Sequence, residues 1–251
     1  MDDDEPAIVP EPRKVERGKN LYEFKGFEFV PRDFEGIARE FNVNLYGNWK
    51  LTSCSTSNAR DSTFYRLEIS KGEVTVDGNP YLAYSTLIQL LSQYDFKALP
   101  EIRVEDELPF RIRGLHLDVA RGGIPLTKTL KELLKTQFLY KFNLLGLYAE
   151  NLFPWENEIG KYEGRLAREE IKEVSKYAKI FGIEVFPSLE LICHMKKILK
   201  HRKELAESES CECLNAMKEE ALDFATSLLI GVLDVFDSKY VHLGGDEAYM
   251  L

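Results

Sequence analysis

The 251-residue chain lacks the features that mark several classes of protein. Its 33 Lys and Arg are outnumbered by 42 Asp and Glu, giving a formal net charge of −9 at pH 7. Such a chain offers no basic face to nucleic acid or anionic lipid. No apolar run approaches the roughly 20 residues of a membrane-spanning helix. The opening MDDDEPAIVPEPRK is acidic and lacks the layout of a secretory leader. We therefore expect a cytoplasmic protein with no nucleic-acid or membrane partner.

Cysteine is also scarce, with only Cys54, Cys193, Cys211 and Cys213 in the chain. The CEC pair is too tightly spaced for a zinc knuckle, and no second Cys or His pair lies at zinc-finger spacing. A cytosolic protein usually keeps such thiols reduced. We expect free thiols, no metal and no cofactor.

The first part of the chain predicts a small α+β domain. Residues 1–19 are interpreted as a disordered acidic lead-in, and the domain as residues 20–108. Alternation of apolar and polar residues indicates half-buried strands, whereas a run with helical spacing begins with Asn79 as N-cap and Pro80 at the first helical position. The expected elements are strands at 64–69, 73–78 and 101–106 and a helix at 79–94.

From residue 109 to 251 the pattern changes to alternating strands and helices, which indicates parallel pairing in an open doubly wound sheet or a barrel. The expected strands are 112–119, 143–150, 183–191 and 240–245, and the expected helices are 127–142, 168–182 and about 215–236.

Polar residues at the ends of these strands favour the barrel, because the loops that follow barrel strands converge on one active site. The stretch RGGIPL lacks the spacing of a dinucleotide-binding loop. A complete barrel has eight strands in about 250 residues. The predicted fold is therefore α/β, a (β/α)8 TIM-type barrel truncated after its fourth strand. The strand-end residues are Asp118, Arg121, Glu150, Asn151, Glu190, His194, Asp246 and Glu247.

The stretch HLGGDEAYML places two carboxylates side by side after the fourth predicted strand. Neighbouring carboxylates oppose each other's ionisation, so Asp246 and Glu247 can supply one general acid and one anion. Glycosidic cleavage needs both. Two other interpretations remain open: a metal site made by His242 with the two acids, or two solvated acids without a role.

Two motifs resemble a known family. HLGGDE resembles the H-x-G-G-D-E signature of glycoside hydrolase family 20, the β-N-acetylhexosaminidases, and RGLHLDVAR (113–121) resembles the R-G-x-x-x-D-x-x-R stretch of its first barrel strand. The similarity runs from about residue 60 to the end, and corresponds to the N-terminal domain and the first half of the catalytic barrel. It implies removal of terminal β-linked N-acetylhexosamine (GlcNAc or GalNAc) by substrate-assisted retaining catalysis.

The resemblance also implies residue roles. Glu247 is the general acid and then the base, and Asp246 holds the acetamido N–H and offsets the developing positive charge. Arg113 grips the sugar hydroxyls, His194 supports the pocket around the acid, and Glu150 lies near a family acidic position. Two supporting residues complete the set, Asp118 and His242.

Half a barrel leaves an open strand edge and an uncovered apolar face. The first hypothesis is therefore a β-N-acetylhexosaminidase that needs a complementary C-terminal half-barrel chain, or a homo-oligomer, for activity on an oligosaccharide or glycoconjugate. The second is a non-catalytic remnant or interaction protein of the same fold, and the third a metal-dependent hydrolase.

Overall fold

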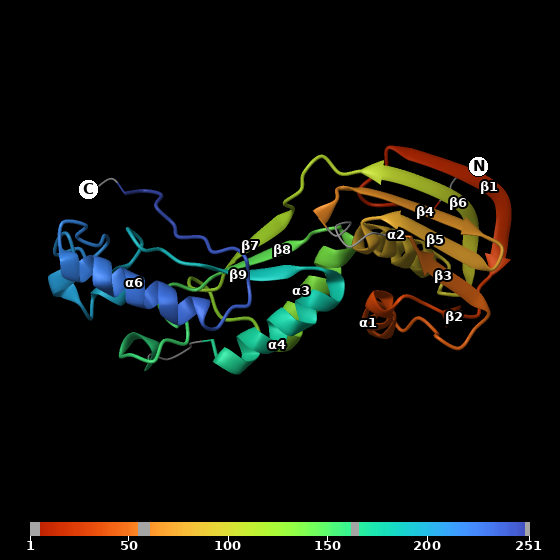
Figure 1. Ribbon diagram of the computed structural model, residues 1–251. Coiled ribbons are helices and arrows are strands. Elements are labelled where there is room, and N and C mark those ends of the chain that lie inside the picture. The colour runs from red at the N-terminus through yellow and green to blue at the C-terminus, as the bar shows by residue number, and fades with distance from the viewer. Residues whose placement is uncertain (1–5, 55–60, 162–165, 249–251) are drawn as a thin grey trace. The chain divides into compact units, whose positions relative to one another are not determined.

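The computed structural model describes residues 6–54, 61–161 and 166–248, and these form two compact units (Figure 1). Unit 1 consists of Met1–Arg113, Leu134–Asn143 and Ile180–Gly182, and unit 2 of Gly114–Leu133, Leu144–Lys179 and Ile183–Leu251. Within the described ranges, every helix is too short or too polar to cross a membrane.

Unit 1 is built on a six-stranded sheet in the order β1-β6-β4-β5-β3-β2. β4 pairs antiparallel with β5 and β6, β1 runs antiparallel to β6, and β2, β3 and β5 run parallel to one another. Alternate residues of β4 are buried, because successive side chains point to opposite faces of a sheet. The strands are β1 (Lys14–Glu23), β2 (Phe27–Phe29), β3 (Trp49–Ser53), β4 (Phe64–Ser70), β5 (Glu73–Gly78) and β6 (Ala98–Glu107).

Two helices, α1 (Arg32–Glu40) and α2 (Pro80–Gln93), cover this sheet. α2 packs across β4, β5 and β6. It starts where predicted, because the side chain of Asn79 accepts hydrogen bonds from the backbone N–H groups of Tyr81 and Leu82. α1 joins the same layer (Figure 1), with the ring centroids of Phe34 and Tyr84 4.9 Å apart.

The predicted strands and helix of this region are confirmed as β4, β5, β6 and α2. The predicted lead-in needs a correction over residues 14–19, which begin β1 instead of being disordered. Main-chain pairing with β6 orders this polar, largely exposed strand, and that pairing leaves no trace in local hydrophobicity. Residues 1–5 lie outside the described part of the chain.

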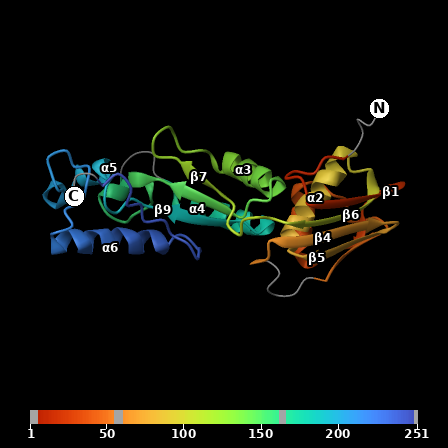
Figure 2. The ribbon, with the colours of Figure 1, turned by 90° about the horizontal axis from the view of Figure 1, so that it is seen from above.

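Unit 2 contains a parallel sheet in the order β7-β8-β9. α3 and α4 lie beside it (Figure 2), and Leu145 and Leu147 of β8 are buried. The strands are β7 (Gly114–Asp118), β8 (Leu144–Tyr148) and β9 (Glu184–Ser188), and the helices are α4 (Arg168–Ala178), α5 (Lys196–Leu199) and α6 (Glu219–Leu233). Helix α3 (Thr127–Leu139) belongs to this unit as far as Leu133, and its remaining residues belong to unit 1. Short 3-10 helices are η2 (Glu150–Leu152), η3 (Ile159–Lys161) and η5 (Lys203–Leu205), while η4 (Lys179–Phe181) begins in unit 2 and ends in unit 1.

The opposite face of this sheet carries aromatic rings. His116 of β7 and Phe186 of β9 stack with centroids 6.5 Å apart across Gly146 of β8. A Cβ on Gly146 would lie 2.6 Å from the Phe186 ring and 2.8 Å from the His116 ring. The glycine in LLGLY therefore allows the two rings to meet over the middle strand.

The truncated barrel predicted from the sequence is present only as an open sheet. β7, β8 and β9 form an open parallel sheet, and the predicted fourth strand is only an isolated parallel bridge between Ser188 and His242. The N–H of Leu189 donates to the carbonyl of His242 at 2.8 Å, and the N–H of His242 donates to that of Pro187 at 3.0 Å. The chain at 240–245 therefore runs beside β9, as a barrel would require, without becoming a regular strand.

The prediction that all cysteines are free thiols is wrong. Cys193 and Cys213 form a disulfide with a sequence separation of 20, whereas Cys54 and Cys211 are free. Spacing along the chain could not reveal this pair, because folding brings the loop after β9 against residues 206–214.

Candidate active site

Residues 240–245, which run beside β9, are called the bridge segment below. The carboxylate pair follows a sharp turn at its end. Gly244 and Gly245 have φ values of 72° and 107°, which glycine adopts without the cost that a Cβ brings. The N–H of Gly244 donates to Nδ1 of His242 at 3.2 Å. The turn places Asp246 and Glu247 beyond the carboxyl end of the chain segment next to β9. Their side chains are 64% and 59% exposed.

His194 brings the two acids together. Its Nε2 lies 3.3 Å from a carboxylate oxygen of Glu247 and 3.5 Å from one of Asp246. The imidazole is 25% exposed, so this side of the acid pair is shielded from water. The backbone of both His194 and Glu247 is left-handed, with φ of 55° and 49°. Such a conformation in a non-glycine residue persists only where its surroundings hold it, and it is enriched at functional sites.

Glu190 is a third carboxyl group at the same place. It is buried, and one of its oxygens accepts a long hydrogen bond of 3.4 Å from the N–H of Gly245. Burial raises the pKa of Glu190, and the nearby charge of Asp246 raises it further. A Cβ on Gly244 would collide with this carboxylate. Gly244 is therefore required for Glu190 to reach the turn that carries the acids.

Glu150 is not free to bind a substrate in this structure. It is buried after β8, its Oε1 accepts from the backbone N–H of Lys197 at 3.1 Å, and its Oε2 lies 3.2 Å from the Lys197 ammonium. The same ammonium donates to the carbonyl of Ala120 at 2.9 Å. Lys197 thus ties the ends of β7 and β8 to the start of α5, and Glu150 serves as its buried counter-charge.

Arg113 lies directly before β7 along the chain, not after it. Its Nε donates to the carbonyl of Lys141 at 2.7 Å, and its Nη1 donates to the carbonyls of Phe110 and Arg111 at 2.7 and 3.1 Å. Partial burial lowers the pKa of the guanidinium. These contacts give Arg113 a local structural role in unit 1, and its predicted grip on sugar hydroxyls stays a prediction.

Asp118 and Arg121 occupy the carboxyl end of β7, where a parallel sheet collects its functional groups. Nη1 of Arg121 donates to Oδ2 of Asp118 at 2.8 Å, and this bond raises the pKa of the arginine. The guanidinium carbon also lies 5.2 Å from the centroid of the Tyr148 ring. Within the described residues, the buried hydroxyl of Tyr148 has no hydrogen-bond partner.

His242 does not join the two acids in a metal-binding group. Its Nδ1 lies 3.2 Å from Oγ of Ser188, and its ring centroid is 5.5 Å from that of His116. Burial lowers the pKa of His116, and the neighbouring His242 lowers it further. Among the described residues, no three His, Cys, Asp or Glu side chains gather closely enough to hold a metal ion. The supporting role expected for His242 stays a prediction.

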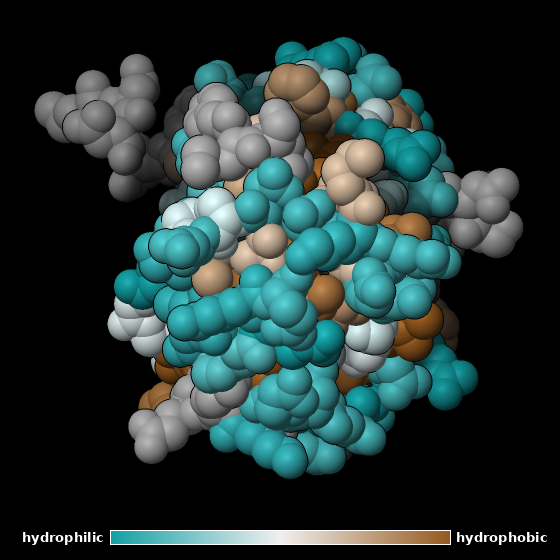
Figure 3. Space-filling model, turned by 90° about the vertical axis from the view of Figure 1, so that its left-hand side faces the viewer, coloured by the Kyte–Doolittle hydropathy of each residue, from teal (hydrophilic) through white to brown (hydrophobic). Residues whose placement is uncertain are grey.

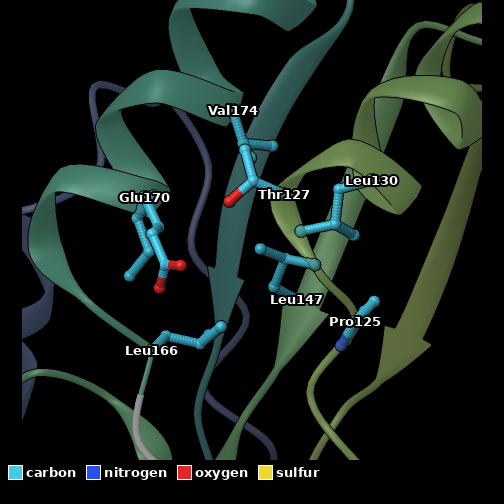
Figure 4. Close-up of a pocket in the computed structure, with 8 residues that line it drawn as sticks. Pro125, Thr127, Leu130, Leu147, Leu166, Glu170 and Val174 are labelled. Atoms are coloured by element: carbon cyan, nitrogen blue, oxygen red, sulfur yellow. The ribbon is translucent and has the colours of Figure 1, made fainter.

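A small pocket lies away from the acids, between α3, α4 and β8 (Figure 4). It is mostly apolar and brings no acid–base pair together, so it is a gap in the packing of the helices on the sheet. On the face shown in Figure 3, hydrophilic residues cover most of the surface and hydrophobic ones show in separate patches. The pocket is lined by Pro125, Thr127, Leu130, Leu147, Leu166, Glu170, Ile171 and Val174.

Sequence reasoning therefore found the acid pair and His194 but missed two contributors. The sequence places Glu190 at a strand end without predicting a role for it, and it gives no indication that Lys197 belongs to the site. The signal for Glu190 is its position four residues before His194, which puts both in the loop after β9. Lys197 carries no such signal, because only the fold shows that its partner is Glu150.

The profile of "Glycosyl hydrolase family 20, catalytic domain" matches residues 148–250. A β-hexosaminidase subunit beta of Entamoeba histolytica is 24% identical over 94% of this chain and 48% of its own length. A β-hexosaminidase of Akkermansia muciniphila is 28% identical over 58% of this chain and 36% of its own. The chain thus spans about half the length, or less, of these curated relatives.

Solved structures show the same fold. A β-N-acetylhexosaminidase of Bacteroides fragilis superposes with a TM-score of 0.79 at 21% identity, covering 97% of this chain and 58% of the other. An exo-β-N-acetylglucosaminidase of Vibrio harveyi, solved with N-acetylglucosamine, gives 0.75 at 19% identity, covering 96% and 46%. The aligned part covers both the α+β region and the parallel strands.

Proposed function

Because this chain belongs to glycosyl hydrolase family 20, we propose that it forms the acid-bearing part of an enzyme that removes terminal β-linked N-acetylhexosamine from glycans. The observation that carries the proposal is the contact of His194 with both Asp246 and Glu247. An imidazole between two carboxylates keeps them in one place and can share a proton with either.

The proposed reaction begins with the substrate's own 2-acetamido oxygen. This oxygen attacks the anomeric carbon while Glu247 donates its proton to the glycosidic oxygen, and the bond to the leaving group breaks. The sugar is then a cyclic oxazolinium ion. Asp246 accepts a hydrogen bond from the acetamido N–H and stabilises the positive charge that develops. Glu247, now ionised, takes a proton from water, which attacks the anomeric carbon and restores the β configuration.

Sugar hydroxyls need a donor on the same edge of the sheet as the acids. Arg121 fits this role better than Arg113, because it follows β7, whereas the donors of Arg113 engage backbone carbonyls. The planar guanidinium can bind two neighbouring hydroxyls. The hydrogen bond to Asp118 leaves other N–H groups of Arg121 to bind the sugar. In this proposal Asp118 supports the site by orienting the guanidinium.

Activity requires more of the barrel than these residues supply. The acids are more than half exposed, and chemistry of this kind depends on excluding water. The bridge segment at His242 pairs with β9 on one side, and α6 exposes large apolar side chains. A complementary half-barrel, in the same chain or in another, would pair with that segment and cover that helix. The exposed side chains are Leu222, Ile230 and Leu233.

The test is hydrolysis of 4-nitrophenyl N-acetyl-β-glucosaminide and its galacto counterpart by the protein and its variants, each produced in the natural host. Glu247→Gln is expected to lower kcat by about 10²–10⁴-fold, and Asp246→Asn by about 10²-fold or more. Glu173→Gln, a surface change on α4, is the matched control and should leave the rate unchanged. The 2-hydroxy analogue of the substrate should not react, because it lacks the attacking amide.

The observed exposure of the acids also favours a second candidate, a non-catalytic protein of the same fold that binds glycans without cleaving them. Calorimetry with N-acetylglucosamine-thiazoline, a stable mimic of the oxazolinium ion, separates the two. Binding that weakens in Asp246→Asn while no substrate is hydrolysed supports the second candidate. Hydrolysis that survives both acid substitutions removes the proposed mechanism, and hydrolysis abolished by a chelator would favour a metal-dependent reaction instead.

A further inference from the structure

The disulfide between Cys193 and Cys213 lies next to the residue that contacts the acid pair. Cys193 is the immediate neighbour of His194 in the chain, and both bridged cysteines are buried. The bond therefore joins the loop that carries the histidine to the segment at 206–214. Neither cysteine takes part in the chemistry proposed above.

Main-chain hydrogen bonds on either side of the disulfide join the same two segments. The N–H of Leu214 donates to the carbonyl of Ile192 at 2.7 Å, and that of Met195 donates to the carbonyl of Glu212 at 3.0 Å. These bonds flank Cys193 and His194, so the loop is attached immediately before and immediately after the histidine. The covalent link stands between the two and keeps both in register.

His194 itself has a conformation that needs such support. Its φ of 55° lies in the left-handed region, which is unfavourable for a residue with a Cβ unless the surroundings hold it there. Its backbone relaxing to a more common conformation would turn the imidazole away from Glu247, 3.3 Å distant, and Asp246, 3.5 Å distant. Among the contacts that oppose this relaxation, the disulfide is the only covalent one in the described residues.

We propose that Cys193 and Cys213 are positioning residues, whose disulfide holds His194 against the two carboxylates and makes the site sensitive to dithiol reductants. Reduction breaks the S–S bond, takes two electrons and two protons from a dithiol, and leaves two cysteine thiols and one oxidised dithiol. The loop is then held by hydrogen bonds alone. The effect on hydrolysis rests on the proposed function, whereas the effect on the histidine contact does not.

The contact can be measured without turnover, because the chain has only four histidines. The imidazole resonances are assigned by NMR with single His→Gln variants. In the oxidised protein, Glu247→Gln is expected to shift the His194 resonance and to leave that of His201 in place. In Cys213→Ser, or after dithiothreitol, this response to Glu247→Gln should fall at least twofold. Cys211→Ser is the matched control: Cys211 is also buried and close to the bridge, but it is a free thiol.

A His194 response of the same size in Cys213→Ser and in the oxidised parent would overturn the proposal. So would a peptide map under non-reducing conditions that finds Cys193 and Cys213 as thiols in the purified protein. Should Cys213→Ser fail to fold, reduction with dithiothreitol followed by air reoxidation makes the same comparison on the unmodified chain.

Hydrolysis provides the second measurement. Dithiothreitol is expected to lower kcat about tenfold, reversibly, in the parent and in Cys211→Ser, with no effect on Cys213→Ser, whose rate is already low. A protein with no hydrolysis in either state counts against the proposed function, while the NMR comparison still decides the role of the disulfide.

Discussion

The two sheets of this protein differ in how completely their strands are buried. Every strand of the six-stranded sheet in unit 1 has a partner, and in β4 the inward-facing residues Tyr65, Leu67 and Ile69 are almost fully buried. In unit 2, β8 is buried throughout, but β7 at the edge is half-exposed or exposed at every position. β9, on the other side of β8, has three of its five residues buried, so the least covered strand of the small parallel sheet is β7.

This contrast suggests different roles for the two units. Unit 1 has the features of a stable core, whereas unit 2 carries the reactive groups on loops around a small sheet. Each unit contains one buried tryptophan, Trp49 in unit 1 and Trp155 in unit 2. Unfolding can therefore be monitored separately, by removing one tryptophan and following the fluorescence of the other in every variant below.

The largest expected effect comes from a cavity in the larger sheet. Leu67→Ala in β4 is expected to cost about 2–5 kcal/mol, because Leu67 is fully buried. Leu117→Ala in β7 should cost about 1 kcal/mol or less, because that side chain is only half-buried. Urea denaturation measures both. Equal losses would show that β7 is covered in solution, as a completed barrel would cover it.

Glycines with left-handed backbone sharpen the comparison. Gly244→Ala is expected to cost about 2–3 kcal/mol, since the new Cβ adds a collision with the Glu190 carboxylate to the backbone penalty. Gly72→Ala, in the turn between β4 and β5, has a φ of 80° but no atom within 4 Å of the new Cβ, and should cost about 1 kcal/mol. Similar costs in the two variants would mean that Glu190 moves aside freely.

The N-cap of α2 has a smaller effect. Asn79→Ala removes the acceptor for two backbone N–H groups, and is expected to cost about 1 kcal/mol. The loss should be seen with Trp49 as the probe, while Asn79→Ser, which keeps a capping oxygen, should recover most of it. A loss detected only by Trp155 would contradict the division of the chain into two units.

The smallest effect depends on pH. The folded protein raises the pKa of Glu190, so this group stabilises the fold at pH values below its ordinary pKa, and the contribution is lost as pH rises through the folded value. The stability of the parent relative to Glu190→Gln is therefore expected to fall as pH increases from about 4.5 towards neutral. This fall in stability should be seen when unfolding is followed by Trp155 fluorescence, and not when it is followed by Trp49 fluorescence. A difference independent of pH would leave Glu190 without a proton-linked role.

Local sequence patterns were sufficient for the helices and strands that carry their own signal, but not for strands that are ordered by distant partners. The N-cap Asn79 and the alternation in β4 and β5 are local signals, and they predicted those elements closely. β1 carries no such local signal, because it is ordered by its pairing with β6. Its Tyr22, for example, pairs with Leu99, which lies more than 70 residues further along the chain. The predicted barrel, truncated after its fourth strand, is present as an open parallel sheet of three strands, and the apolar run at 240–245 forms only an isolated bridge with β9.

The candidate site shows the same limit. HLGGDE identified Asp246 and Glu247 because the motif is contiguous. The ion pair of Glu150 with Lys197 and the disulfide beside His194 join segments that the sequence keeps apart, so each needed the fold to be seen. Arg113 and Arg121 belong to one motif, and only their positions before and after β7 distinguish their surroundings.

The link between Cys193 and Cys213 also has a consequence for limited proteolysis. Exposed residues such as Lys203 and Glu207 lie between the bridged cysteines, so a protease can cut there. A single cut would leave both fragments joined, and the nicked protein would migrate as one band without reductant and as two with it. The cleaved chain could thus keep its histidine loop in place after losing its continuity.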